Sequence, residues 1–180
     1  MKKVQLLAVM LAIFSSAAFG QTLKVESLYT SLSTRACKTI ESNPDEGGSY
    51  RGSCPGVGGY KLELLEGDIR QTINVLSPNK KKYELNLWSV VSSGFSSVGE
   101  KAEWRVTRTG KTVVPNALIL RFNASEDPED STKITSYLVV IKITKTEACV
   151  TNVVKPSTDQ NIKARELADA SFGKYCKTSE

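Results

Sequence analysis

Charged and aromatic side chains alternate with apolar residues along several segments of this chain, with the two-residue period of β-strands. If those strands are neighbours, one sheet face carries several guanidinium groups with aromatic rings nearby. The candidate binding residues are Tyr60, Arg70, Trp88, Glu103, Arg105 and Arg121. Guanidinium groups suit bidentate recognition of carboxylates or phosphates, and arginine with tryptophan or tyrosine makes a good interface anchor. The alternative is a structural ion-pair network on a solvated face, such as Arg105 with Asp68 or Glu63.

Few residue types in this chain support catalysis. The sequence contains no histidine, which excludes Ser–His and Cys–His nucleophiles and histidine-based metal sites. Two Ser-x-x-Lys pairs occur, Ser77 with Lys80 and Ser171 with Lys174. The first lies in a predicted turn and the second at the predicted end of a helix, whereas a Ser–Lys dyad needs this spacing at the start of a helix. We therefore assign no catalytic residue, no metal ligand and no cofactor.

These observations favour a non-catalytic binding, accessory or inhibitor-like module that recognises a protein or an envelope component. The alternative is an envelope hydrolase that uses paired carboxylates or a Ser–Lys dyad. Paired carboxylates serve glycoside hydrolysis, and the candidates by number alone are Glu63, Glu66, Asp68 and Glu103. The formal net charge of +5 is small and its basic residues are dispersed, so we expect no nucleic-acid partner.

The first twenty residues have the pattern of a secretory signal peptide. Two lysines precede an apolar run over 4–14, and the small residues Ala18 and Gly20 fit a cleavage site. No later segment approaches the roughly 20 apolar residues that span a bilayer. We expect residues 1–20 to be removed and residues 21–180 to form a single domain. The protein is then periplasmic or secreted, with no membrane span after cleavage.

Four cysteines in an exported chain indicate disulfide bonds. They are Cys37, Cys54, Cys149 and Cys176. Four cysteines allow three pairings, and the sequence alone does not decide among them. We favour Cys37–Cys54 with Cys149–Cys176, because each pair closes a local loop and ties one end of the domain to its body. A zinc site is disfavoured because its ligands are usually closely spaced pairs of cysteine or histidine.

Seven segments read as strands that would place these residues. Their ranges are 60–65, 69–76, 83–91, 102–107, 117–122, 134–144 and 149–155. Most alternate apolar and polar residues, as strands with one buried face do. Segment 134–144 differs because its middle is apolar on both faces, which is typical of a central strand that is covered on both sides.

One helix is predicted near the end of the chain. Ser157 and Gln160 form a capping-box pattern ahead of good helix formers over 162–170. Small residues, among them Ala164 and Ala168, form a narrow stripe that allows close packing on a sheet. The predicted fold class is therefore α+β, a mainly antiparallel sheet with one C-terminal helix packed on it and disulfide cross-links.

Six short stretches along the chain also carry a resemblance. They are 27–32 with Cys37-Lys38, Cys54-Pro55-Gly56 with Gly59-Tyr60, Asp68-Ile69-Arg70, Glu103-Trp104-Arg105, Pro115 with Ala117-Leu118-Ile119, and 164–169. In this order they resemble an uncharacterised group of small exported bacterial proteins, over most of the chain after residue 20. The group has no assigned activity. The resemblance thus implies a bacterial, exported protein and adds no mechanism.

Overall fold

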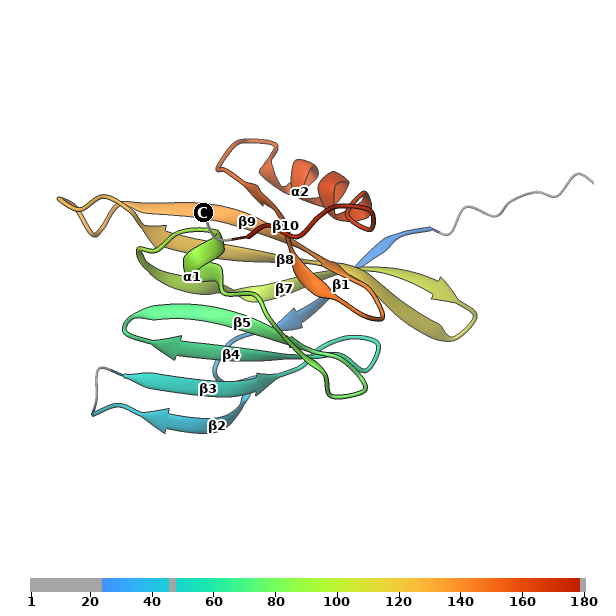
Figure 1. Ribbon diagram of the computed structural model, residues 1–180, viewed down its shortest axis with the longest axis horizontal. Coiled ribbons are helices and arrows are strands. Elements are labelled where there is room, and N and C mark those ends of the chain that lie inside the picture. The colour runs from blue at the N-terminus through green and yellow to red at the C-terminus, as the bar shows by residue number, and fades with distance from the viewer. Residues whose placement is uncertain (1–23, 46–47, 179–180) are drawn as a thin grey trace, which may run out of the picture.

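The computed structural model describes residues 24–45 and 48–178 (Figure 1). The predicted signal peptide lies outside the described residues. In chain order the elements are β1 (Glu26–Ser31), β2 (Lys38–Asn43), β3 (Ser49–Cys54), β4 (Lys61–Gly67), β5 (Arg70–Leu76), β6 (Lys82–Glu84), α1 (Leu87–Val90), β7 (Phe95–Thr109), β8 (Thr112–Ser125), β9 (Ile134–Ile143), β10 (Ala148–Val154) and α2 (Gln160–Asp169). Among these residues no helix is long and apolar enough to cross a bilayer.

The ten strands form one mainly antiparallel sheet in the order β10-β9-β8-β7-β5-β4-β3-β2, with β1 paired to β7 and β6 paired to β5. The link between β7 and β5 is narrow and parallel, and only Arg70 and Ser96 are partners there. Figure 1 accordingly shows two groups of strands, with β7–β10 above β2–β5. Leu62 and Ile73 of the lower group share one buried cluster with Leu118 of the upper group. The sheet therefore bends at this link and encloses its core.

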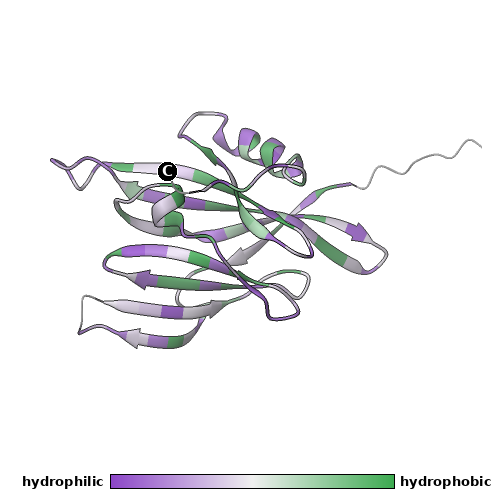
Figure 2. Cartoon of the chain, viewed as in Figure 1, coloured by the Kyte–Doolittle hydropathy of each residue, from purple (hydrophilic) through white to green (hydrophobic). Residues whose placement is uncertain are grey.

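The core is built from the inward residues of alternating strands, and Figure 2 shows this alternation of hydrophobic and hydrophilic residues along the strands. Trp104 and Phe122 are the largest side chains that are fully buried. The indole N–H of Trp104 donates to Thr30 Oγ1 at 2.9 Å, so its one polar atom is satisfied inside the apolar cluster. This bond also fixes β1 against β7.

Helix α2 covers the opposite, outer face of the sheet over β8 and β9 (Figure 1). Ala164 and Ala168 pack there in a second buried cluster with Ile119, Leu138 and Val140. Strand β9 is thus covered on both faces, as predicted for segment 134–144. The predicted α+β class, with a C-terminal helix packed on an antiparallel sheet, is confirmed.

The favoured disulfide pairing is also confirmed. Cys37–Cys54 joins the segment before β2 to the end of β3, and Cys149–Cys176 ties the segment after α2 to β10. The backbone N–H of Lys177 donates to the carbonyl of Val150 at 2.8 Å. The chain after α2 is therefore held along β10 by a covalent and a hydrogen bond.

The predicted strand over 83–91 is wrong for most of its length. Only β6 is extended there, and the short helix α1 follows. Asn86 has a φ of 46°, a left-handed conformation that ends the extended chain. The next residue, Leu87, is fully buried, and its N–H donates to Thr72 Oγ1 at 3.0 Å. The chain after β6 therefore buries Leu87 against β5 and does not continue as a paired strand.

The predicted capping box at the start of α2 is wrong as well. Asp159 occupies the N-cap without a capping side-chain hydrogen bond. The side-chain amide of Gln160 is buried and donates to the carbonyls of Ser136 and Val154, at 2.8 and 3.0 Å. Buried carbonyl groups need hydrogen-bond donors. The Gln160 side chain therefore binds carbonyl groups of β9 and β10 and does not cap the start of the helix.

Leu118 is fully buried in the core, so its truncation should destabilise the fold. We expect Leu118→Ala to lower the free energy of unfolding by about 2–5 kcal/mol, because it removes buried methyl groups and leaves a cavity. Val114→Ala on the same strand is the control, since Val114 is 42% exposed, and it should cost no more than about 1 kcal/mol. Urea unfolding of the oxidised protein, followed by circular dichroism, measures both. Equal losses would contradict the assigned core.

Candidate functional site

A cleft lies between α2 and the outer face of the sheet, and it encloses about 490 Å³. We call it the helix–sheet cleft. Its floor is apolar and consists of Ile119, Leu138 and Ala164. Its walls carry polar and charged side chains from β1, β7, β8 and α2, namely Tyr29, Glu100, Lys101, Glu103, Arg121, Asn161 and Arg165. An apolar floor with a few convergent polar groups is the usual character of a ligand site.

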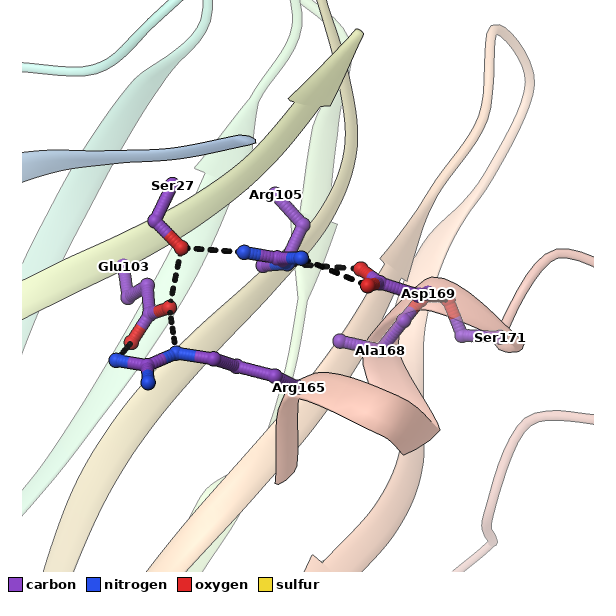
Figure 3. Close-up of polar contacts among 7 residues, drawn as sticks. All are labelled: Ser27, Glu103, Arg105, Arg165, Ala168, Asp169 and Ser171. Carbon is purple, nitrogen blue, oxygen red and sulfur yellow. Dashed lines mark hydrogen bonds and ion pairs between the residues drawn. The ribbon is translucent and has the colours of Figure 1, made fainter. Parts of the chain in front are cut away.

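Two ion pairs join β7 to α2 (Figure 3), and one of them, Glu103 with Arg165, lines the cleft. Arg165 donates from Nε and Nη2 to the carboxylate of Glu103, at 2.6 and 3.1 Å. Arg105 donates from Nε and Nη2 to the two carboxylate oxygens of Asp169, both at 2.7 Å. Between the pairs, the hydroxyl of Ser27 donates to Glu103 at 2.6 Å and accepts from Arg105.

The spacing of these residues explains why the pairs form together. Glu103 and Arg105 are two apart on a strand, which places them on one face about 6.6 Å apart along the chain. Arg165 and Asp169 are four apart on a helix, on one face and about 6 Å apart. The charge order is negative then positive on β7 and positive then negative on α2. The two elements therefore match in both distance and sign.

The environment favours the charged forms of Glu103, Arg105 and Arg165. Partial burial raises the pKa of Glu103, but hydrogen bonds from Arg165 and Ser27 outweigh that effect and hold the pKa below its ordinary value. Hydrogen bonding to Asp169 raises the pKa of Arg105. The carboxylate of Glu103 raises the pKa of Arg165 in the same way. The ionised carboxylate of Glu103 and the protonated guanidinium group of Arg165 thus stabilise each other.

Arg121 lies on the same sheet face but has a different environment. Its Nη1 donates to Ser136 Oγ at 2.8 Å and to Gln160 Oε1 at 3.4 Å, and both partners are neutral. Among residues 24–45 and 48–178 no carboxylate forms an ion pair with it. Arg121 therefore places in the wall of the cleft a positive charge that is in no direct ion pair.

A β-bulge makes room for this arginine. The register of β7 against β8 shifts between Val98 and Ala102, and such bulges redirect side chains next to functional sites. A Cβ at Gly99 would lie 2.9 Å from Cβ of Arg121, so only glycine leaves space for the arginine stem. Lys101, on the same bulge, lines the cleft.

The predicted binding face is only partly assembled. Glu103, Arg105 and Arg121 share the face under α2, whereas Arg70 lies at the hairpin between β4 and β5. There Arg70 donates to the carbonyl of Ser93 at 2.9 Å, pairs with Asp68 and stacks over Phe95.

The two aromatic candidates also lie away from the cleft. Trp88 is on helix α1. Tyr60 packs against the inner core with its ring centroid 6.4 Å from that of Trp104, and its hydroxyl donates to the carbonyl of Thr144 at 3.3 Å. The six candidates therefore occupy four separate places, and only three of them are near one another.

The ion-pair interpretation of Arg105 holds, but its proposed partners are wrong. Asp68 pairs with Arg70. Glu63 is buried and accepts a hydrogen bond from Asn74 at 2.9 Å. Arg105 pairs instead with helix α2, because the outer face of β7 is not solvated there.

Sequence reasoning missed the contribution of α2. Arg165 and Asp169 each follow one residue after a member of the buried stripe, Ala164 and Ala168. That position borders the packed face of the helix, and this was the signal available. Tyr29 was also missed, and its hydroxyl lies 3.2 Å from Nη2 of Arg165.

Neither Ser-x-x-Lys pair forms a dyad in the described structure. The hydroxyl of Ser77 donates to the carbonyl of Lys81 at 3.0 Å. The hydroxyl of Ser171 donates to the carbonyl of Ala168 at 2.7 Å. The Ser77 hydroxyl therefore stabilises a turn, and the Ser171 hydroxyl stabilises the end of helix α2.

One group of side chains in the described part of the chain has the spacing of metal ligands, namely Glu147, Cys149 and Cys176. Its two cysteines form a disulfide, so neither offers the thiolate that binds metals. Glu147 pairs with Lys142 at 2.6 Å. These residues therefore act as a structural staple.

No family model, curated protein or solved structure matches this chain. Its function must therefore be argued from the helix–sheet cleft and the rest of the surface.

The lowered pKa of Glu103 predicts a pH dependence of stability. Because its pKa in the folded protein lies below the ordinary value of 4.5, its ion pair stabilises fully above about pH 4.5, and this contribution is lost as the pH falls further. We expect the free energy of unfolding of the native chain to fall more steeply between about pH 5 and pH 3 than that of Glu103→Gln. At pH 7 the variant should be less stable by roughly 1–3 kcal/mol.

Denaturant titrations at several pH values measure this difference. Glu129→Gln is the matched control, because Glu129 is exposed in the loop after β8 and forms no ion pair among the described residues. It should follow the pH profile of the native chain. Parallel profiles for all three proteins would contradict the role of Glu103.

Proposed function

We propose that this protein is an exported, non-catalytic binding module, accessory or inhibitor-like, whose helix–sheet cleft recognises a carboxylate on a protein or envelope component. The observation that carries the proposal is Arg121, a guanidinium group in the cleft wall whose hydrogen-bond partners are neutral. A partly buried guanidinium group whose direct partners are neutral can accept an anion as a further partner, and arginine suits carboxylates.

The other residues of the helix–sheet cleft indicate which class of ligand it would bind. Glu103 is already paired with Arg165, so it cancels that charge, and the wall also carries Glu100 and Lys101, whose charges are opposite. The lining therefore keeps one net positive charge, and Arg121 is its cation outside these pairs. The apolar floor of Ile119 and Leu138 favours a hydrocarbon group next to the carboxylate. A hydrophobic residue at a free peptide C-terminus has both features.

The environment of Glu103 supports binding over hydrolysis. A general acid for glycoside cleavage needs a raised pKa, whereas the pKa of Glu103 is lowered. Its bidentate pairing with Arg165 also occupies both carboxylate oxygens. The two disulfides are compatible with an oxidising, extracytoplasmic location.

A pair of short peptides tests the carboxylate. We expect N-acetyl-Ala-Leu with a free C-terminus to shift backbone amide signals of Ile119 and Leu138 in NMR titrations of the oxidised protein, and the C-terminal amide of the same peptide to shift them far less. Arg121→Gln should weaken binding about tenfold or more, as expected for loss of a charged hydrogen bond. Arg70→Gln, which alters an arginine outside the cleft, should bind as the native chain does. Equal binding of acid and amide, or no binding of either, would refute the proposal.

Gly99→Ala provides a second test of the same wall that leaves every charge in place. The added methyl group would lie within 2.9 Å of the arginine stem and must displace Arg121. We expect weaker binding of the free-acid peptide, with the native fold retained by circular dichroism. Gly67→Ala is a control, because a Cβ at Gly67 meets no atom within 4 Å and its φ lies outside the left-handed region. Unchanged affinity in Gly99→Ala would remove Arg121 from the site.

A further inference from the structure

A second surface lies at the end of the sheet where the β9–β10 turn meets the segment after α2. Two aromatic rings protrude there, since Phe172 is 80% exposed and Tyr175 is 95% exposed. No other large hydrophobic side chain in the described part of the chain is as exposed. Exposed apolar groups of this size usually mark an interaction site when they occur together.

The backbone that carries the rings is fixed. Cys176, next to Tyr175, is cross-linked to Cys149. The carbonyl of Lys174 accepts a hydrogen bond at 2.7 Å from Nζ of Lys142, which is itself almost buried. Figure 1 shows this segment running beside β10. The two rings therefore project from a fixed segment of backbone and are not packed in the protein's own core.

Apolar surface continues next to Phe172. A groove of about 580 Å³ is lined by Phe172, Val114, Pro115 and Ile143. Val114 is itself partly exposed. The protruding rings thus stand beside further apolar area rather than in isolation.

Lysines surround this apolar surface. Lys145 lines the groove, Lys174 and Lys177 flank Tyr175, and Nζ of Lys81 donates to the carbonyl of Thr146 at 3.1 Å. Among the described residues none of these four lysines forms an ion pair with a carboxylate. The acidic residue nearest in the turn, Glu147, is taken by Lys142. The surface therefore has a net positive charge, and we call it the aromatic–lysine ridge (Lys81, Lys145, Phe172, Lys174, Tyr175 and Lys177).

We propose that the aromatic–lysine ridge docks the protein reversibly on an anionic lipid surface. Phe172 and Tyr175 enter the headgroup region, where aromatic rings are favoured, and the lysines contact anionic headgroups. The charge favours an anionic lipid surface over a protein partner, because four lysines outside any ion pair among the described residues surround two rings that are 80% and 95% exposed. Few apolar groups enter the bilayer, so the attachment needs both the rings and the charges.

Vesicle co-sedimentation of the oxidised protein, residues 21–180 as expected after removal of the signal peptide, tests this inference. We expect the protein to pellet with vesicles of phosphatidylcholine containing about one-third phosphatidylglycerol at low salt, and to bind pure phosphatidylcholine vesicles at least about tenfold more weakly. High salt should release it, because the lysine contribution is screened. Failure to bind the anionic vesicles at low salt would overturn the proposal.

Variants assign the binding to the ridge. Phe172→Ser with Tyr175→Ser, and separately Lys145→Gln with Lys174→Gln, should each weaken binding about tenfold. Ile69→Ser with Phe95→Ser is the matched control, since both residues are exposed and hydrophobic but lie at the β4–β5 hairpin and the start of β7. It should bind as the native chain does. Equal binding by native chain and ridge variants would also overturn the proposal. The cleft residues are separate, so either proposal can fail alone.

Discussion

The position of α2 depends on two ion pairs of opposite direction that join it to β7. The apolar contact of this helix is small, because its fully buried side chains facing the sheet are mainly those of Ala164 and Ala168. Burial of a methyl group contributes little compared with burial of leucine or phenylalanine. Paired guanidinium and carboxylate groups therefore decide where the helix lies, and its position creates the cleft between helix and sheet.

Such pairs specify an arrangement more than they stabilise it. The desolvation of two charged groups offsets much of the free energy gained from their attraction. Removal of one partner is still destabilising, because it leaves a partly buried charge unpaired. The opposite order of charges on β7 and α2 adds a directional requirement. If the helix were reversed, Glu103 would face Asp169 and the two arginines would face each other, so only one orientation satisfies all four groups.

Local pattern was sufficient for the outline of the fold and insufficient for the site. Alternation predicted strands at β4, β5 and β7 to β10 but none at β1, β2 or β3. The small-residue stripe predicted the packed helix, and loop closure favoured the observed disulfides. The common face of Glu103 and Arg105 followed from their spacing. Their partners did not, because Arg165 and Asp169 lie about sixty residues away and no local rule relates a strand to a helix at that separation. Segment 95–101 was missed because the bulge at Gly99 interrupts the alternation on which strand prediction relies.

The same helix links the two surfaces. Asp169, the last residue of α2, holds that end of the helix to β7, and the chain leaves directly toward Phe172 and the disulfide at Cys176. The segment that carries Phe172 and Tyr175 is thus fixed at both ends, by an ion pair before it and a covalent bond after it. Reduction of the disulfide would release only the far end and leave Arg165 in place. The cleft therefore depends on electrostatics within the sheet–helix layer, whereas the ridge depends also on an oxidising environment.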